Sequence, residues 1–479
     1  MTLIEQYIKN KIVTSSSDVI KFCVEELHLQ ESAARKRIQR LPAHIFKYKG
    51  ICSNKQSILY HKDNWMVDGY TNTLISVLKQ HAKQHYIIIK ALEIHSGYIP
   101  INKLASYSIS PIGLVKGHKS FISIIKDLKK MHLIDDDGDN YILLSEEINE
   151  KRSKAQNLIH NITIEHFNNW ARNIGLISYN ATKYNAACNN YQFGMVAPSY
   201  IKSLMGYSNS GKIVPGFVIA DILVGVPLDE NAILFFIEKM KNIIALHSSP
   251  KCLPFFITDS HDSDIYSKLK NDGIIIGNVD ELFGVQYSET IKGILNLMEN
   301  AGAILKTNPQ KYLDLLNNIE KLAIGKTNNL KGDLFEMTVG YYHGQLCQSL
   351  EIGKKVFYEQ DQREIDVFAL YQNRVVVAEC KGYNTKLSLD VIDKWLSDKI
   401  PVIRKWLLSQ ESLNGREVCF ELWCTGGFDD DALKKLENAS SKTKRYKIQY
   451  YSYQDMTQLA KNNNVKHFQK LLKTYYYSE

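Results

Sequence analysis

The stretch "RVVVAECKG", residues 374–382, limits the possible folds of this chain more than any other part of its sequence. Its unbroken run of apolar residues is typical of a strand that is covered on both faces of a sheet. Side chains two positions apart in a strand point to the same side, so Glu379 and Lys381 project together while Cys380 points away. The sequence therefore predicts a buried strand that ends in two opposite charges, at a sheet rim that can open to solvent.

The residues before this strand predict its neighbour in a hairpin. Residues 363–382 have the pattern of a strand, a turn at 372–373 and a second strand. The hairpin brings Asp366 beside Glu379 and Lys381. Three charged side chains from two adjacent strands are therefore expected to share one end of a sheet.

A helix pattern precedes the hairpin and supplies one more acidic residue. Glu336 lies near the start of this helix, within "LKGDLFEMTVGYYHGQL". His343 lies further along the same helix and is expected on its surface rather than as a catalytic base. Glu336 is therefore the fourth candidate for the charged site.

These residue types suit the hydrolysis of a phosphodiester bond. That reaction needs a hard cation against the phosphate, an activated water and stabilisation of charge on the leaving oxygen. Two carboxylates suit Mg²⁺, which prefers oxygen ligands and keeps several waters. A lysine beside them can position the water and offset charge in the transition state. The pattern predicts Mg²⁺ as the cofactor, with Mn²⁺ as a substitute.

The order of helix glutamate, strand aspartate and Glu-x-Lys after a hairpin resembles the PD-(D/E)XK nucleases, in particular their Mrr-like restriction endonuclease branch. The resemblance covers about residues 331–460, including a helix, a strand, a helix and a strand after the hairpin. It implies that Asp366, Glu379 and the backbone carbonyl of Cys380 bind the metal. It also implies that Lys381 assists the attacking water and that Glu336 completes the site. One departure is Ile365, where the family motif has proline.

The N-terminal segment predicts a basic domain. Residues 1–60 carry 10 Lys and Arg against 5 Asp and Glu, and the whole chain has a net charge of +8. Three helix patterns, 3–11, 16–27 and 32–41, precede two extended pieces, which resembles a winged helix-turn-helix. The third helix and the wing formed by the two extended pieces supply the expected DNA contacts. These are Arg35, Lys36, Gln39 and Arg40 on the helix, and Lys47, Lys49 and Lys55 in the wing. The alternative is a small helical domain with a solvated basic face.

A second pattern of this kind follows at residues 69–155 and also resembles a winged helix. Its wing carries Asp135, Asp136, Asp137 and Asp139, which repel phosphate, so we expect this copy to pack against protein. Residues 135–146 also resemble a calcium-binding EF-hand loop, with Asn140 where that loop has glycine. The sequence leaves this alternative open.

The middle of the chain repeats the order of elements of the C-terminal third. "GFVIADILVG" aligns with "VVVAECKG", so that Asp221 falls on Glu379 and Leu223 on Lys381. No Asp or Glu lies between residues 191 and 216, so the counterpart of Asp366 is missing. We expect a non-catalytic nuclease-like domain kept for substrate binding or dimer contacts. The alternative is an unrelated α/β domain, which a different strand order would support.

Together these patterns predict an α/β multidomain protein. Its parts are a basic winged helix (1–68), a second winged helix (69–155), an inactive nuclease-like α/β domain (156–288), a helical connector (289–329) and a nuclease domain with a mixed sheet (330–479). The eight cysteines form no CxxC pair, which gives no sign of a zinc site or a disulfide framework. Charged residues near the N-terminus and short apolar runs predict a cytoplasmic protein without a membrane segment.

The function predicted from the sequence is Mg²⁺-dependent endonucleolytic cleavage of nucleic acid in restriction or anti-phage defence, with duplex DNA as the expected substrate and RNA as the alternative. Cleavage of both strands needs two active sites, which favours a homodimer. One alternative is a DNA-binding regulator or scaffold with an inert nuclease fold. Another is the cleaving subunit of a larger defence or transposition complex with protein partners.

Overall fold

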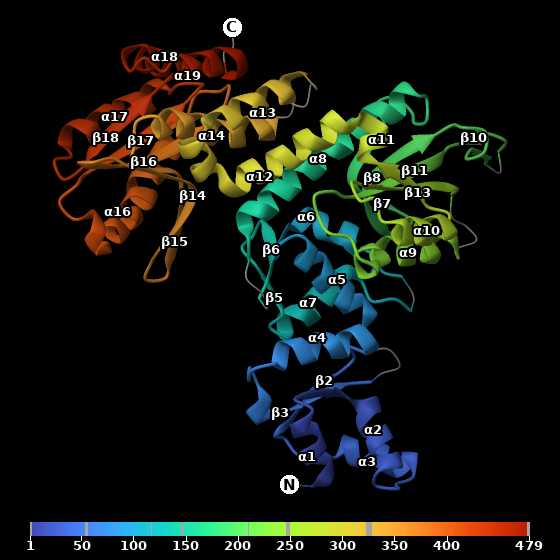
Figure 1. Ribbon diagram of the computed structural model, residues 1–479. Coiled ribbons are helices and arrows are strands. Elements are labelled where there is room, and N and C mark those ends of the chain that lie inside the picture. The colour runs from blue at the N-terminus through green and yellow to red at the C-terminus, as the bar shows by residue number, and fades with distance from the viewer. Residues whose placement is uncertain are drawn as a thin grey trace. The chain divides into compact units, whose positions relative to one another are not determined.

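The computed structural model describes residues 2–52, 56–115, 117–144, 148–208, 210–245, 250–321 and 328–476. The chain forms two compact units, residues 1–288 and 289–479 (Figure 1). Each unit contains one five-stranded mixed sheet with helices, which confirms an α/β multidomain protein. The finer division into five domains stays a prediction. Within the described residues, the helices are too short or too polar to span a membrane.

The first unit begins with the three predicted helices and the two predicted extended pieces, but a further strand, β1, lies between the first two helices and completes a three-stranded antiparallel sheet. The strand order is β1-β3-β2. Thr2 and Ser15 accept hydrogen bonds from backbone N–H groups as N-caps of the first two helices, which fixes where these helices begin. The bounds are α1 Leu3–Asn10, β1 Val13–Ser15, α2 Ser16–Glu25, α3 Glu31–Gln39, β2 Ile45–Tyr48 and β3 Ile58–His61.

A second small sheet, of order β4-β6-β5, follows with its own helices. Phe121, Ile124 and Leu128 recur at helical spacing and form the buried stripe of one helix, as their pattern predicts. The bounds are η2 Lys62–Asn64, α4 Tyr70–His81, α5 Lys83–Ile94, β4 Tyr98–Pro100, α6 Ile101–Leu104, η3 Ala105–Tyr107, α7 Phe121–Lys130, β5 Ile134–Asp136 and β6 Asn140–Leu143.

The five-stranded sheet of the first unit has the order β13-β12-β11-β8-β7. Strand β8 is antiparallel to both of its neighbours, whereas β11, β12 and β13 are parallel. The bounds are α8 Glu150–Asn173, β7 Lys183–Cys188, β8 Tyr191–Ser199, β9 Gly206–Tyr207, β10 Ile213–Val214, β11 Gly216–Leu223, α9 Glu230–Ile244, β12 Cys252–Thr258, α10 Ser263–Asn271, β13 Ile275–Asn278 and α11 Val279–Phe283. Helix α12 (Val285–Thr307) begins at the end of this unit.

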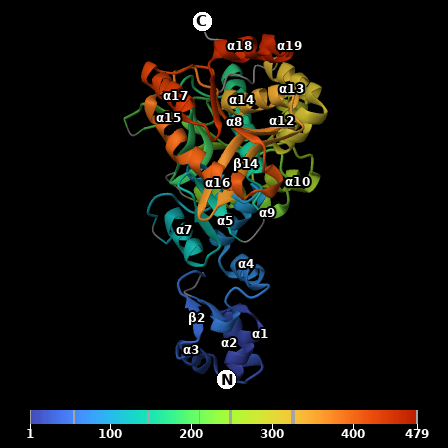
Figure 2. The same ribbon diagram turned by 90° about the vertical axis from the view of Figure 1, so that its left-hand side faces the viewer.

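The second unit has a sheet of order β14-β15-β16-β17-β18. Its β14–β15 hairpin packs in part on α16 (Figure 1), and α15 packs on α17 (Figure 2). The bounds are α13 Pro309–Lys321, α14 Asn328–Gly344, β14 Ser349–Tyr358, β15 Asp361–Leu370, β16 Arg374–Lys381, α15 Leu389–Lys394, η5 Trp395–Lys399, α16 Ile400–Ser409, η6 Glu411–Leu413, β17 Glu417–Cys424, α17 Asp430–Lys442, β18 Lys447–Tyr451, α18 Tyr453–Asn462, α19 Lys466–Leu471 and η7 Leu472–Tyr476.

The helix expected after β16 is interrupted by a π-helical segment, η5. Pro401 follows it at the start of α16 and has no N–H group to donate to the carbonyl one turn earlier. The π-helical turn thus lies directly before a position that lacks a backbone donor. Lys399 is the last residue of η5 and lies where the helix faces the sheet.

The two five-stranded sheets have the same topology. In each, the first two strands form an antiparallel hairpin, the third strand is antiparallel to the second, and the last two run parallel to the third. A different strand order would have contradicted a nuclease-like middle domain, and the observed order does not. The helix after the third strand packs on its Asp221 side in the first unit and on its Glu379 side in the second.

Candidate active site

Asp366 and Glu379 meet at the end of the β15–β16 ladder. The last paired residues are Val367 and Ala378, and the two acidic residues follow one step beyond them on each strand. Both are buried, with 7% and 9% of their surfaces exposed. Asp366 Oδ2 accepts a hydrogen bond of 2.7 Å from the backbone N–H of Cys380, which fixes its side chain and leaves Oδ1 facing the cluster.

Lys381 lies on the same side of β16 as Glu379, as strand alternation predicts. Its Nζ is 2.8 Å from Glu379 Oε1. The side chain of Cys380 is buried on the opposite side. The structure therefore brings together three of the four residues predicted to be catalytic.

Lys399 joins this cluster, although the sequence interpretation missed it. Its Nζ donates a hydrogen bond to Glu379 Oε2 and lies 3.7 Å from Asp366 Oδ1. A lysine 20 residues after Glu379 in an amphipathic helix pattern looks like any solvated lysine. The signal that could have found it is Pro401, which predicts a disturbed helix turn next to Lys399.

The charges in the cluster shift one another's protonation. Burial raises the pKa of Asp366 to about 6, and the nearby charge of Glu379 adds to this effect. Burial also disfavours ionised Glu379, but the ammonium groups of Lys399 and Lys381 outweigh it and lower the pKa of Glu379. The two carboxylates in turn raise the pKa of both lysines against the effect of burial. Near neutral pH the cluster contains two carboxylates and two ammonium groups.

The donor set fits Mg²⁺ or Mn²⁺. Magnesium is commonly held by one or two carboxylates, with waters and substrate phosphates completing its shell. Asp366 Oδ1 and the Glu379 carboxylate are oxygen groups of this kind, and both already contact the positive charge of Lys399. Among the described side chains, no set of three or more His, Cys, Asp or Glu residues forms a metal cage. The site therefore offers a carboxylate pair rather than a closed cage, and a role for the Cys380 carbonyl stays a prediction.

Glu336 lies on α14, which packs against β14, β15 and β16. Burial raises the pKa of the Cys380 thiol, and the charges of Asp366 and Glu336 raise it further. The charge of Glu336 thus reaches Cys380, as do the charges of Asp366 and Glu379. Its catalytic role stays a prediction.

The expectation that His343 lies on the helix surface is wrong. His343 is buried, its Nδ1 is 2.9 Å from the hydroxyl of Tyr371, and its Nε2 lies 3.2 Å from Glu421 Oε2. Glu421, on β17, accepts a 2.9 Å hydrogen bond from the Trp423 indole. Buried polar groups need partners, and the sequence of α14 alone shows neither the Tyr371 hydroxyl beside Nδ1 nor the Glu421 carboxylate near Nε2.

The predicted DNA-contacting residues occupy the α3 region. Arg35, Lys36, Gln39 and Arg40 are exposed, and Arg35 forms an ion pair of 2.6 Å with Glu31. Lys47 is half-buried, and its ammonium donates 2.8 Å to the carbonyl of Ile38 at the end of α3. Lys49 is exposed, and Lys55 lies outside the described residues.

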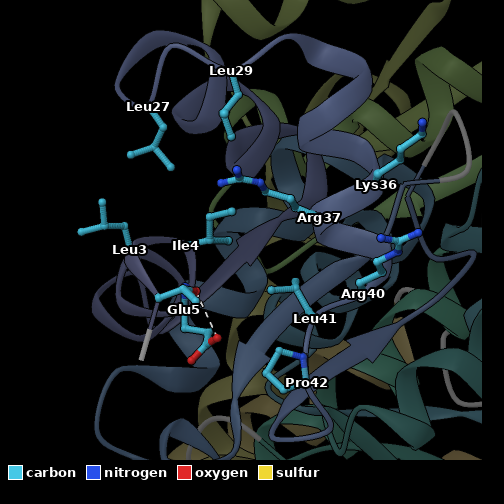
Figure 3. A pocket seen from close by; sticks show the side chains of 11 residues that line it. Leu3, Ile4, Glu5, Leu27, Leu29, Lys36, Arg37, Arg40, Leu41 and Pro42 are labelled. Carbon is cyan, nitrogen blue, oxygen red and sulfur yellow. Dashed lines mark hydrogen bonds between the residues drawn. The ribbon is translucent and has the colours of Figure 1, made fainter.

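A groove of about 650 Å³ runs along one flank of α3 (Figure 3). Apolar side chains from α1 and from the segment before α3 form part of its wall, including Leu3, Ile4, Leu27 and Leu29. Lys36 and Arg40 line the opposite part. Arg37, which was not among the predicted contacts, extends toward Leu29 and Ile4.

The carboxylates of the acidic wing bind groups of the wing itself and of the neighbouring helix α7. Asp136 is bound by Lys129 Nζ, which also lies 3.6 Å from Asp135. Asp137 accepts hydrogen bonds from the backbone of Asp139 and Asn140. These contacts are typical of a turn between β5 and β6. Glu146, the last ligand position of the EF-hand alternative, lies outside the described residues.

The corresponding position in the first unit is sealed. Asp221 lies one step beyond Ala220 and Met195, the last paired residues of β11 and β8, just as Glu379 lies beyond Ala378 and Val367. The same register sets Gly194 in the place of Asp366. Gly194 donates its N–H to Asp221 Oδ1 at 2.6 Å, in the reverse sense of the Cys380 to Asp366 bond.

Lys239, from the helix after β11, fills the space beside Asp221. Its Nζ is 2.7 Å from Asp221 Oδ2 and also donates to the carbonyls of Ser106 (2.6 Å) and Gln192 (2.8 Å). The side chains of Lys239 and Asp221 are 0% and 1% exposed. Burial raises the pKa of Asp221 to about 6 despite the charge of Lys239. Leu223, the counterpart of Lys381, is buried and apolar.

Comparison with known proteins adds little to this geometry. No protein-family model matches the chain, and no curated protein matches it. A solved structure of the restriction endonuclease FokI bound to DNA is matched with a TM-score of 0.17 and 11% identity, over 57% of this chain and 58% of that one. The chain thus spans less than two thirds of the FokI chain, and a TM-score this low does not establish a shared fold.

Proposed function

We propose that this protein is a metal-dependent endonuclease that hydrolyses phosphodiester bonds of DNA at the cluster of Asp366, Glu379 and Lys381. One observation carries the proposal. The buried carboxylates of Asp366 and Glu379 meet Lys381 at the end of the β15–β16 pair. Asp366 accepts a hydrogen bond from the backbone of Cys380, and Glu379 lies within hydrogen-bonding distance of Lys381. Burying charged groups is unfavourable unless they are paired or bind a cation, so such a cluster is typical of a functional site.

The residues have distinct roles in the proposed reaction. A bound divalent cation would supply positive charge for the phosphate and make a water more acidic. Asp366 and Glu379 would hold that cation, with the Cys380 carbonyl as a further ligand. Lys381, which Glu379 holds in place, would donate a hydrogen bond to the attacking water and offset negative charge on the phosphate. Glu336 would complete the site from α14.

Duplex DNA is the proposed substrate because of the basic side chains on α3. Exposed Lys36, Gln39 and Arg40 and the neighbouring Arg37 suit contacts to phosphate, which supply most of the affinity of a DNA-binding module. A homodimer would provide the two active sites that a double-strand cut needs. A role in restriction or anti-phage defence, alone or as the cleaving subunit of a larger complex, follows from the family resemblance only.

One observation favours an inert nuclease fold that only binds DNA. Both oxygens of the Glu379 carboxylate contact lysines, Oε1 with Lys381 and Oε2 with Lys399. A purely structural cluster of ion pairs would have the same appearance. Cleavage assays separate the two functions.

The test is incubation of the full-length protein with supercoiled plasmid, linear duplex, single-stranded DNA and RNA, in Mg²⁺, Mn²⁺ or EDTA. Asp366→Asn is the test variant, and Asp361→Asn, an exposed change on the same strand, is the matched control. We expect metal-dependent cutting of duplex DNA by the wild type and the control but not by Asp366→Asn. Cutting that survives Asp366→Asn, or DNA binding without cutting in every metal, would contradict the proposal.

A further inference from the structure

Lys399 holds the position that a cation needs in the proposed metal site. Its ammonium binds Glu379 Oε2 and lies 3.7 Å from Asp366 Oδ1, so one positive charge bridges the two carboxylates. Asp366 Oδ2 is already bound to the backbone of Cys380 and Glu379 Oε1 to Lys381. Lys399 thus contacts the two carboxylate oxygens that neither Cys380 nor Lys381 contacts.

An ammonium group and a divalent cation cannot both occupy this position. Two positive charges about 4 Å apart repel each other strongly in a partly buried site. Lysine is well suited to leave, because its charge is carried on a flexible four-carbon stem. The side chain of Lys399 is 20% exposed, so solvent reaches it.

The first unit shows what the same arrangement becomes when the lysine cannot leave. Lys239 holds Asp221 from the equivalent helix, but its side chain is 0% exposed and bound by two backbone carbonyls as well. The pair is a fixed part of the core. Like Lys239, Lys399 lies on the helix after the third strand of its sheet and binds a carboxylate of that strand. Unlike Lys239, its side chain is partly exposed to solvent.

We propose that Lys399 is an internal counter-ion of the Asp366–Glu379 pair that must move away before a divalent cation binds, and that it thereby lowers the metal affinity of the site. This inference rests on the proposed function, because it assumes that the carboxylate pair binds metal. Without metal, Lys399 neutralises two carboxylates that otherwise repel each other. With metal, its ammonium is released from both.

The test is Mn²⁺ binding to the full-length protein, followed by electron paramagnetic resonance and by calorimetric titration. The measurements are made at pH 8 and repeated at pH 9, because loss of the Lys399 charge raises the pKa of Asp366 and a proton there would compete with Mn²⁺. The variants are Lys399→Gln, which removes the charge, and Lys399→Arg, which keeps it. Lys394→Gln, an exposed lysine on α15, is the control for loss of one positive charge from the same segment.

We expect Lys399→Gln to bind Mn²⁺ at least about tenfold more tightly than the wild type, because removal of one nearby repelling charge is worth that much or more. Lys399→Arg and Lys394→Gln should stay within about threefold of the wild type, a difference well under 1 kcal/mol. Unchanged or weaker Mn²⁺ binding by a folded Lys399→Gln protein, with binding by the wild type, would overturn the inference alone. Absence of Mn²⁺ binding in the wild type and every variant would contradict the proposed function and this inference with it.

Discussion

The two five-stranded sheets of this protein share a topology but end their third strands differently. In the first unit Asp221 is joined by Gly194 and Leu223, and Lys239 seals it from solvent. In the second unit the equivalent positions are Glu379, Asp366 and Lys381, and the cluster keeps partial exposure. Strand order therefore does not decide whether such a fold has a reactive site. Three side chains at the strand ends make the difference.

The comparison also separates two uses of a buried ion pair. A pair that is fully buried needs every hydrogen bond to offset the loss of water, and Lys239 has three acceptors. Such a pair is rigid and inaccessible. The Glu379 cluster is less buried, and the proposed metal site depends on this access to solvent.

The largest expected effect comes from replacing Lys381 of the second sheet with leucine, the residue at the equivalent position of the first sheet. Lys381→Leu copies Leu223 and removes the charge beside Glu379. We expect cleavage to fall by about 10²–10³-fold, the cost of losing one group that stabilises developing charge. Lys386→Leu, an exposed change nearby, should cut like the wild type. Equal activity of the two variants in a plasmid-nicking assay would contradict the catalytic role proposed for Lys381.

The next effect is on stability, in the sealed pair. Lys239→Met leaves Asp221 buried without its counter-ion, which costs about 3–5 kcal/mol. Lys241→Met changes an exposed lysine on the same helix and should cost about 1 kcal/mol or less. Urea denaturation followed by circular dichroism measures both. A loss below about 1 kcal/mol for Lys239→Met would show that the pair is not the sealed structural contact described above.

A double variant sharpens the same point. Asp221→Asn combined with Lys239→Met removes both charges, so no uncompensated charge stays in the core. We expect the double variant to be more stable than Lys239→Met by about 1–3 kcal/mol, a coupling typical of residues in direct contact. Additive losses in the same urea titration would mean that the two side chains do not act as a pair.

The smallest effect is on the pH dependence of metal binding. In the metal-free protein, burial and the charge of Glu379 raise the pKa of Asp366 to about 6. A proton on Asp366 competes with metal, so Mn²⁺ affinity should be independent of pH well above 6 and fall by about tenfold per pH unit below it. Calorimetric titration between pH 5 and 8 measures this. A flat profile across that range would exclude Asp366 as a ligand that must lose a proton.

Much of the second sheet could be predicted from the sequence because strand alternation is a local property. The apolar run 375–378 and the turn at 372–373 fixed the register that brings Asp366, Glu379 and Lys381 together. The alignment of Asp221 with Glu379 also agrees with the observed register in both sheets. These predictions needed only the period of two residues along a strand.

Contacts that join distant elements were not predictable in this way. Lys399 and Lys239 each lie on a helix after the strand whose carboxylate they bind, and helical periodicity alone gives them no special place. His343 was misplaced for the same reason, since its partner Glu421 comes from β17. In each case tertiary packing brings a charged side chain to a buried partner, which overrides the usual preference of charged residues for the surface.

Diffraction from crystals of the protein soaked in Mn²⁺ tests the central claim most directly, because the anomalous signal of manganese locates the ion itself. The account predicts a peak between Asp366 and Glu379, with the Lys399 ammonium moved away from both carboxylates and no peak beside Asp221. A peak beside Asp221, or no peak at the Asp366–Glu379 pair while Lys399 still bridges it, would contradict the account.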